Sequence, residues 1–311
     1  MPIASLHDIL REARNGSYGV PYCESWNLES AQAVVEAAEK VRSPAIVGFN
    51  GGFLQHPSRR QPEKLAWYAG VRLALESASV PVALLLNEST TLDQMADAIR
   101  LGFNAVMPEN EGLSLEEYRC LVKEAVALAH PKGVWVEAQI GTLPAGHALH
   151  NGAHNSSHNS NGEMTDPYTA AAFVSETGVD ALGVSIGNVH VMTSGKASPD
   201  LDALKRIRAM VDVPLVVHGG TSLTPGSLRT MVLLGVAKIN FGTVLKQAYL
   251  EAVRESLASY GPPLNPHRYL GMGGEEDIMT AGRAAVRRKV EELMEICGST
   301  GRVAHDFNPA V

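Results

Sequence analysis

The sequence has little cysteine and no long apolar run. Its three cysteines among 311 residues are Cys23, Cys120 and Cys297, and their spacing fits neither a disulfide framework nor a metal site. We therefore expect three buried thiols in a reducing compartment. No apolar stretch approaches the roughly 18 residues of a membrane-spanning helix, and residues 1–17 read as a short amphipathic helix rather than a signal peptide. The sequence thus predicts a cytoplasmic protein with no membrane partner.

The sequence also lacks an excess of basic residues. Its formal net charge is −7, whereas a general nucleic-acid binder presents a basic face. We therefore expect no nucleic-acid partner. Hydrophobic residues make up 45% of the chain, which allows a sizeable core in one large domain or two smaller ones.

Short apolar segments alternate with longer amphipathic ones along the chain. The eight segments that read as strands are 18–23, 44–50, 81–87, 104–109, 134–140, 181–186, 214–220 and 237–242. Segments such as 28–41, 91–102 and 113–130 have the apolar periodicity of helices. Alternation of this kind predicts a parallel sheet covered by helices. Eight such units favour an α/β fold of the (β/α)8 TIM-barrel type, with residues 1–311 as a single domain. The absence of Gly-x-Gly-x-x-Gly after the first strand weakens the alternative of a dinucleotide-binding fold.

In a parallel barrel the C-terminal ends of the strands meet at one mouth, where the chemistry takes place. Polar residues at or just after the predicted strand ends are Asn50, Asn87, Glu88, Glu109, Glu137, Gln139, His190, His218, Asn240 and Thr243. The strand 81–87 is unusual, because an apolar run ends on Asn87 and Glu88 without a turn residue. Either a helix is capped near Ser89 or Thr90, or the strand carries Asn87 and Glu88 into a site.

One segment, 144–167, breaks the alternation of strands and helices. It is rich in Gly, Asn, Ser and His, and a loop of this length in a compact domain is usually functional or disordered. Because it follows the fifth predicted strand, we expect it to form a lid over the mouth of the barrel. Its histidines, His147, His150, His154 and His158, bind a metal in one interpretation and belong to a solvated loop in the other.

Two histidines follow neighbouring predicted strands, His190 and His218. A single histidine in such a position is more often a hydrogen-bonded structural residue than a ligand. With a carboxylate from a third strand end, however, two imidazoles form a common three-ligand set that leaves positions open for substrate, and zinc is the usual ion. The sequence therefore offers a divalent-metal site as one alternative.

A glycine-rich stretch joins the seventh predicted strand to the next helix. Backbone N–H groups of Gly219, Gly220, Thr221 and Ser222, together with those of residues 240–243, can cradle a phosphate. A tight turn also needs glycine, so the composition is not specific. The position favours phosphate, because the loops after strands seven and eight are the usual place for one in a barrel.

The stretch VPLVVHGGTSLTPGSLRTMVLLGVAKINFGT (213–243) resembles the signature of the class II ketose-bisphosphate aldolases, the fructose- and tagatose-bisphosphate aldolase family. Residues 136–141, 179–190 and 286–302 resemble the family as well, in the same order. The resemblance implies a (β/α)8 barrel that forms a homodimer or homotetramer. It also implies a divalent metal, commonly zinc, that polarises a ketose carbonyl and stabilises the enediolate of dihydroxyacetone phosphate.

The resemblance also implies roles for individual residues. It assigns two metal ligands to His190 and His218. It assigns phosphate binding to Gly219, Thr221, Ser222, Asn240 and Thr243. Thr221 stands where the family usually has Ser, and Ser222 where it usually has Gly.

The end of strand 81–87 departs from the family. Where the family's third strand usually ends in His-x-Asp-His, this chain has Leu85, Leu86, Asn87 and Glu88. The family's aspartate is the general acid/base, and the histidine after it is the third metal ligand. Asn87 can hydrogen-bond a hydroxyl but cannot exchange a proton near neutral pH. Glu88 can still bind a metal, although its charge weakens the pull of the ion on a carbonyl.

Further departures surround the same site. Residues that differ from the family's usual ones are Glu109 (Asp), Gln139 (Glu), Val191 (Gly) and Ser194 (Lys). The last two thin the phosphate site, which Lys196 can compensate. The lid, where the family usually carries a catalytic glutamate, is the His-rich segment here.

Three hypotheses follow from these residues. The first is a metal-dependent carbon–carbon lyase that acts on a phosphorylated or acidic keto-sugar other than the standard bisphosphates. Its catalytic residues are Asn87, Glu109, Glu137 and His154, its metal ligands Glu88, His190 and His218, and Asn50 joins the substrate-binding residues. The acid/base is Glu109 or a lid residue, namely His150, His154 or Glu163. The second hypothesis is a non-catalytic paralogue that binds a sugar phosphate, and the third is a metal-assisted isomerase or epimerase.

Overall fold

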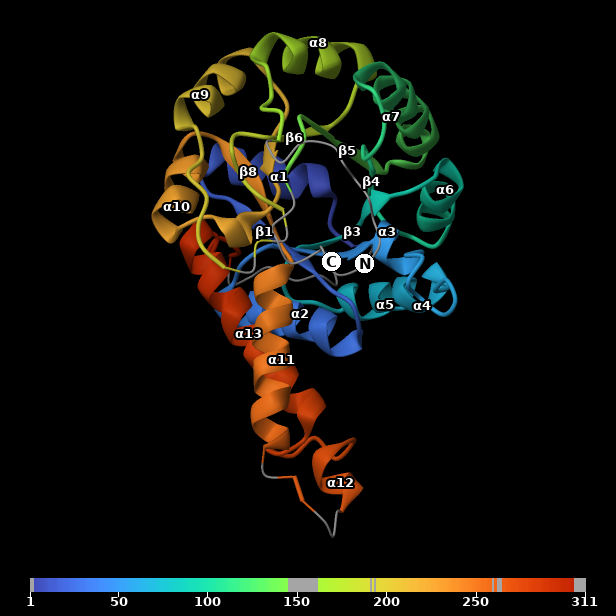
Figure 1. Ribbon diagram of the computed structural model, residues 1–311, viewed down its shortest axis with the longest axis vertical. Helices are drawn as coiled ribbons and strands as arrows, with labels where there is room; N and C mark the ends of the chain where they lie inside the picture. The colour runs from blue at the N-terminus through green and yellow to red at the C-terminus, as the bar shows by residue number, and fades with distance from the viewer. Residues whose placement is uncertain are drawn as a thin grey trace.

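Eight parallel strands form a closed barrel, which is viewed along its axis in Figure 1. The strands are β1 (Val20–Glu24), β2 (Ala45–Asn50), β3 (Val82–Ser89), β4 (Ala105–Pro108), β5 (Trp135–Ile140), β6 (Ala181–Val184), β7 (Leu215–Val217) and β8 (Val236–Phe241). Each strand pairs with the next, and β1 closes the barrel by pairing with β8, where Tyr22 lies opposite Asn240. The predicted TIM-barrel fold and all eight predicted strands are confirmed. This computed structural model describes residues 3–144, 162–190, 192, 194–258, 260–261 and 265–304.

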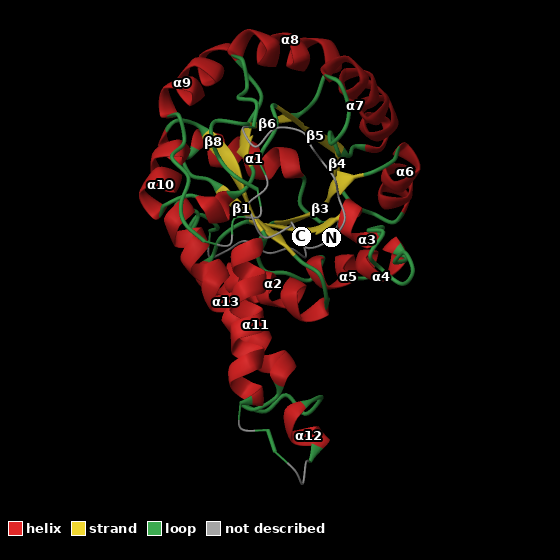
Figure 2. Ribbon diagram, in the orientation of Figure 1, coloured by secondary structure: helices red, strands yellow, loops and turns green. Residues whose placement is uncertain are grey.

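Helices surround the strands on all sides (Figure 2). They are α1 (Leu6–Asn15), α2 (Leu28–Val41), α3 (Gly51–Leu54), α4 (Leu65–Ala69), α5 (Val71–Leu75), α6 (Leu92–Arg100), α7 (Leu115–Ala129), α8 (Pro167–Thr177), α9 (Leu201–Met210), α10 (Pro225–Leu233), α11 (Thr243–Leu257), α12 (Pro266–Tyr269) and α13 (Ile278–Cys297), with short 3-10 turns η1 (His130–Lys132) and η3 (Gly220–Ser222). The predicted helix 28–41 matches α2 at both ends.

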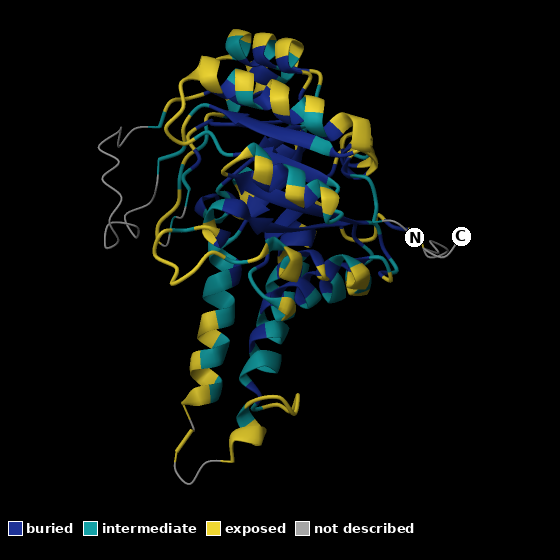
Figure 3. Cartoon of the chain, turned by 90° about the vertical axis from the view of Figure 1, so that its right-hand side faces the viewer, coloured by how far each residue is buried: buried dark blue, intermediate teal, exposed yellow. Residues whose placement is uncertain are grey.

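The strands are apolar because both of their faces are buried. Ile46, Ala83 and Leu85 point into the barrel and belong to its inner cluster, whereas the next residues along each strand, such as Leu84, pack outward against the helices. All eight positions of β3 are buried. Figure 3 shows the same pattern as a buried centre under helices with exposed outer faces.

Helix α1 closes the end of the barrel opposite the site. Its buried residues Leu6, Ile9 and Leu10 pack with the inward-facing residues of the strands. The N–H of Ala4, just before α1, donates to the carbonyl of Val82 at the start of β3 over 2.9 Å. The predicted amphipathic first helix is therefore confirmed, and its apolar face belongs to the barrel.

Helices α11 and α13 pack along each other and extend beyond the barrel as an arm that carries α12 near its tip (Figures 1 and 3). This arm was not predicted from the sequence. Exposed apolar side chains on it include Leu250, Leu270 and Met272.

Two sequence-based expectations were wrong in detail, namely the burial of all three cysteines and the end of the third strand. Cys23 and Cys297 are buried, but Cys120 is exposed, because it lies on the outer face of α7. The helix after β3 is capped by Thr91, whose hydroxyl accepts a hydrogen bond from the N–H of Gln94, so the cap expected near Ser89 or Thr90 lies one residue farther along the chain. Ser89 instead belongs to β3, which ends two residues later than predicted. No helix in the described part of the chain is long and apolar enough to cross a membrane.

Candidate metal and substrate site

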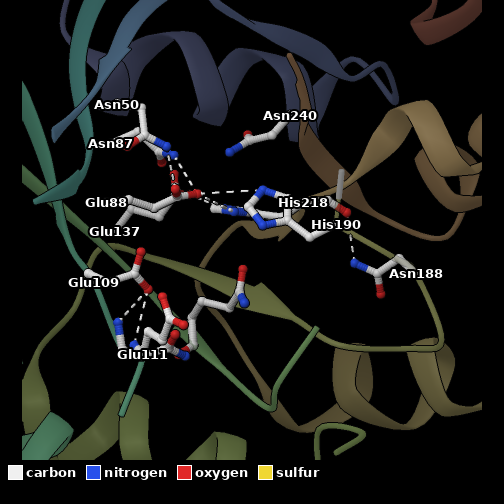
Figure 4. A network of polar contacts seen from close by, with 12 residues as sticks. Asn50, Asn87, Glu88, Glu109, Glu111, Glu137, Asn188, His190, His218 and Asn240 are labelled. Carbon is white, nitrogen blue, oxygen red and sulfur yellow. Dashed lines mark hydrogen bonds and ion pairs between the residues drawn. The ribbon is translucent and has the colours of Figure 1, made fainter. Parts of the chain in front are cut away.

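Glu88 stands at an irregularity in the barrel. The register between β3 and β4 shifts between Leu86 and Ser89, and Glu88 has a φ of 52°. The left-handed backbone conformation is uncommon for residues other than glycine, and the residues that adopt it are often found at functional sites. The bulge turns the Glu88 side chain toward the mouth of the barrel, where Figure 4 places it among the other polar residues.

Two amides hold the Glu88 carboxylate. Asn87 Nδ2 donates to Oε1 over 2.9 Å, and Asn50 Nδ2 donates to Oε2. Asn50 is itself fixed, because its Oδ1 accepts a hydrogen bond from the N–H of Phe53 over 3.0 Å and so caps α3. Burial, followed by the nearby Glu24 carboxylate, raises the pKa of Glu88 to about 7. The two amide donors and the positive charge of Lys246 act to lower this pKa but do not outweigh burial.

Both predicted metal histidines face the same oxygen of Glu88 (Figure 4). Glu88 Oε1 lies 3.8 Å from His190 Nε2 and 3.8 Å from His218 Nδ1. The His218 side chain is 2% exposed, whereas that of His190 is 40% exposed. Three side chains from three strand ends thus converge at the mouth.

His218 is oriented by a second carboxylate. Its Nε2 lies 2.9 Å from Glu137 Oε1, so the Nε2–H donates a hydrogen bond to the ionised Glu137 and Nδ1 keeps a free lone pair toward Glu88. Burial lowers the pKa of His218 to about 4, which keeps the ring neutral. Burial also acts to raise the pKa of Glu137, but the positive charge of Lys238 and the hydrogen bond from His218 outweigh it and lower that pKa.

The donor set of this cluster suits a divalent metal. A carboxylate and two neutral imidazoles with lone pairs turned toward one point are typical zinc ligands. Ligand atoms around tetrahedral zinc lie about 3.4 Å apart, so distances of 3.8 Å from Glu88 Oε1 exceed that spacing by a few tenths of an ångström. Within the described residues no three such side chains already stand at coordinating distance of an ion. Glu88, His190 and His218 therefore fit a metal in chemistry and direction, and need a small inward shift to bind one.

Lys238 is a buried residue of the site that the sequence analysis missed. It is 0% exposed, its Nζ lies 2.8 Å from Glu137 Oε2, and it donates to Asn240 Oδ1 over 2.6 Å. It also lies over the Tyr22 ring, 4.7 Å from the centroid. A lysine among the apolar residues of a barrel strand was the available signal, because a lysine is almost never buried without partners.

Asn240 receives its orientation from Lys238. An ammonium group only donates hydrogen bonds, so the contact fixes the amide oxygen of Asn240 on Lys238 and turns Nδ2 the other way. This Nδ2 is buried and has no partner among the described residues. Figure 4 shows the amide directed toward the cluster of Glu88 and the histidines. Asn87 Oδ1 is likewise buried without such a partner, so at least this donor and this acceptor are unsatisfied in the described part of the chain.

The predicted phosphate residues lie in η3 and at the start of α11. Gly219 has a φ of 69°, and a Cβ there would lie 2.3 Å from the carbonyl oxygen of Val189, so the position requires glycine. Lys196 Nζ donates to the Thr221 carbonyl over 2.7 Å and brings a positive charge beside the turn. Thr243 is the first residue of α11, whose N-terminus has no side-chain cap.

Ser222 does not contribute a free donor to this region. Its N–H donates to the carbonyl of Gly219 over 2.9 Å, and its hydroxyl donates to the same carbonyl over 2.8 Å. The 3-10 geometry of η3 uses both groups internally. The cradle that the structure offers therefore consists of Gly219, Thr221, Lys196 and the start of α11.

Glu109 is a carboxylate outside the candidate ligand set that is suited to proton exchange. It is half-buried just after β4, and its Oε1 accepts hydrogen bonds from the N–H groups of Asn110 and Glu111. Burial, followed by the Glu88 carboxylate, raises the pKa of Glu109 to about 7. A group with a pKa near the working pH can both take and return a proton.

The other predicted residues either lie outside the described part of the chain or have contacts of their own. His147, His150, His154, His158 and most of the lid lie outside the described residues, as does Val191. Glu163 is exposed, and its N–H donates to Thr142 Oγ1 over 2.7 Å. Gln139 is buried near the mouth, with no partner for its Oε1 in the described part of the chain.

Comparison with known proteins is consistent with this geometry. The family model described as fructose-bisphosphate aldolase class-II matches residues 4–302. A fructose-bisphosphate aldolase of Thermus caldophilus is 33% identical over 318 residues, which cover 95% of this chain and 98% of that protein. The protein YdjI of Escherichia coli strain K12 is 32% identical over 291 residues, which cover 94% of this chain and 96% of YdjI.

Two solved structures are similar over nearly their whole length. The crystal structure of the YdjI aldolase matches with a TM-score of 0.78 and 29% identity, and covers 97% of this chain and 100% of that one. The structure of a putative fructose-1,6-biphosphate aldolase from Coccidioides immitis matches with a TM-score of 0.78 and 25% identity, and covers 96% of this chain and 97% of that one.

Proposed function

We propose that this chain, which belongs to the class II fructose-bisphosphate aldolase family, cleaves a phosphorylated or acidic keto-sugar other than fructose or tagatose 1,6-bisphosphate. Members of the family are aldolase-type lyases and generally depend on a divalent metal. The contact between Asn87 and Glu88 carries this proposal. An amide occupies the place of the family's acid/base carboxylate, and a carboxylate occupies the place of a metal-binding imidazole. Both changes affect the groups that act on the bond to be cleaved.

Glu88, His190 and His218 are the proposed metal ligands. When bound there, a divalent ion, which we propose to be zinc, polarises the carbonyl of the substrate. Glu137 holds the proton on Nε2 of His218 and so keeps Nδ1 available. Asn50 and Asn87 donate to the two oxygens of Glu88 and hold its carboxylate in one orientation.

The substrate contacts follow from the buried groups without partners. Asn240 Nδ2 donates to a substrate oxygen, and Asn87 Oδ1 accepts a hydrogen bond from a substrate hydroxyl. The phosphate lies against Gly219 and Thr221, where Lys196 and the start of α11 supply positive charge. Glu109 removes the proton from the substrate hydroxyl that becomes the aldehyde oxygen of the released product. In the alternative assignment His154 has this role.

We also propose that the protein is a homodimer or homotetramer in the cytoplasm, with the arm of α11 and α13 in the subunit interface. The exposed Leu250, Leu270 and Met272 on the arm support this assignment, because a second subunit that covered them would remove their apolar surface from water.

The protein purified without chelators or added metal should carry about one divalent ion per chain. His190→Ala and His218→Ala should each strip the ion, because either loss leaves two ligands. His267→Ala, an exposed histidine on α12, should retain it and serves as the control. Elemental analysis by mass spectrometry measures all four proteins. Full metal content in both site variants would show that the ion, if any, lies elsewhere.

Phosphate binding is measurable without turnover. Inorganic phosphate or dihydroxyacetone phosphate at about 100 times its dissociation constant should stabilise the protein by about 2.7 kcal/mol and raise its melting temperature. Lys196→Met should reduce the shift, because it removes the charge beside Thr221. Lys205→Met, on the exposed side of α9, should leave the shift unchanged. A melting temperature that neither ligand moves would mean that Gly219 serves only a tight turn.

A further inference from the structure

A cavity adjoins the proposed metal site. It has a volume of about 180 Å³, roughly that of six water molecules in the liquid, and Glu24, Ser25, Trp26, Asn50, Phe53 and Lys246 are among its lining residues. Asn50 is common to both places, because its side chain also holds Glu88. Glu24 is the last residue of β1 and Asn50 the last of β2, so the cavity opens at the same mouth of the barrel.

The charges of this cavity are already paired. Lys246 Nζ contacts Glu24 Oε1 and lies 4.5 Å from the centroid of the Phe53 ring. Arg59, which also lines the cavity, binds Glu63 through Nη1 over 3.0 Å and donates from Nε to the Phe53 carbonyl. Each cation thus has a carboxylate partner. A second phosphate would have to compete with Glu24 for Lys246 and with Glu63 for Arg59, and its contact with the Glu24 carboxylate would be strongly unfavourable.

The cavity nevertheless has a polar group to offer. Ser25 is 3% exposed, and its hydroxyl has no hydrogen-bond partner among the described residues. A buried hydroxyl without a partner is costly unless a ligand satisfies it. Trp26 and Phe53 add aromatic surface on which the C–H faces of a sugar chain can pack.

We propose that this cavity, which we call the Ser25 pocket, binds the uncharged, hydroxylated end of the substrate, the part released as the aldehyde. This assignment rests on the proposed function and makes it more specific: the substrate carries its phosphate at the Gly219 end and no second phosphate at the other. Glu24 excludes an anionic end, and Ser25 accepts or donates one hydrogen bond to a hydroxyl of the chain.

Condensation in the reverse direction tests the proposal. Dihydroxyacetone phosphate and an aldehyde combine without loss of atoms. The new carbon–carbon bond joins the hydroxymethyl carbon of the first to the carbonyl carbon of the second, and the proton removed from the first ends on the hydroxyl made from the aldehyde. The wild-type protein should use glyceraldehyde at least about tenfold better, in kcat/KM, than glyceraldehyde 3-phosphate.

Two variants separate charge from shape. Glu24→Gln should raise the ratio of glyceraldehyde 3-phosphate to glyceraldehyde use by about tenfold, because it frees Lys246 for an anion. Ser25→Ala should raise KM for glyceraldehyde several-fold without lowering the melting temperature, since the hydroxyl has no partner to lose. The control is Glu291→Gln, which breaks a comparable pair with Lys40 on the outside of the barrel and should leave both values unchanged.

The outcomes distinguish this proposal from the function on which it rests. A preference for glyceraldehyde 3-phosphate in the wild type, or an unchanged ratio in folded Glu24→Gln, would overturn the assignment of the Ser25 pocket while leaving the lyase activity intact. If neither aldehyde condenses with dihydroxyacetone phosphate, the proposed function fails and the assignment falls with it.

Discussion

Lys238→Met should destabilise the protein by about 3–5 kcal/mol, because it leaves the Glu137 charge buried without a cation. The two groups are 2.8 Å apart and neither is exposed. Methionine has nearly the length of lysine and fills the space without the charge. Urea unfolding, followed by fluorescence, measures the loss of free energy.

The same variant should weaken metal binding by about 10–100-fold. Lys238 keeps Glu137 ionised, and Glu137 fixes the proton on Nε2 of His218. The double variant Lys238→Met with Glu137→Gln should recover much of the stability, since no charge is left buried alone, but not the metal affinity. Lys40→Met removes an exposed pair with Glu291 and should cost less than about 1 kcal/mol. Unchanged metal affinity in folded Lys238→Met would show that Lys238 contributes to stability but not to metal binding.

The wild-type protein should cleave fructose and tagatose 1,6-bisphosphate poorly, and Asn87→Asp with Glu88→His should raise that activity. Loss of a positioned acid/base group costs about 10²–10⁴-fold in rate, and a carboxylate ligand reduces the pull of the metal further. Histidine is one of the residues enriched in left-handed backbone, so it is compatible with the φ of 52° at position 88. The double variant should gain more than either single change.

A coupled assay for triose phosphate release measures this gain. The matched control makes the same chemical changes on the exposed end of α1, Asn15→Asp with Glu12→His, and should gain nothing. Wild-type turnover of either bisphosphate near 10 s⁻¹, about the median for enzymes, would contradict the proposed change of chemistry. Glu109 and His154 would then be the first residues to replace, since one of them would already do the work of the missing aspartate.

The sequence was sufficient for the fold because the barrel strands report their burial directly. β3 is buried at every position, and such a strand must read as an apolar run whatever its neighbours are. The residues at and after the strand ends could also be predicted, since parallel strands bring Glu88, His190 and His218 to one mouth regardless of side-chain detail. Their grouping follows from topology alone.

The contacts inside the site were not accessible in this way. The partner of Lys238 depends on the face of β8 that the side chain occupies and on the rotamer of Glu137. The alternation of side chains along a strand specifies neither of them. The free donors of η3 were also overestimated, because the N–H of Ser222 turns inward to Gly219. The arm was missed because the amphipathic pattern of α11 and α13 does not reveal how far the two helices extend past the barrel.

The pairing of β1 with β8 affects how the chain folds. Tyr22 and Asn240 face each other in the register of these strands, although more than two hundred residues separate them in the chain. Closure of so long a loop is entropically costly, and contacts between distant residues slow folding. During synthesis on a ribosome, the sheet formed by the first seven strands therefore keeps an unpaired edge on each side until β8 has been synthesised. Unpaired edges invite aggregation, so this protein is most vulnerable just before its last strand emerges.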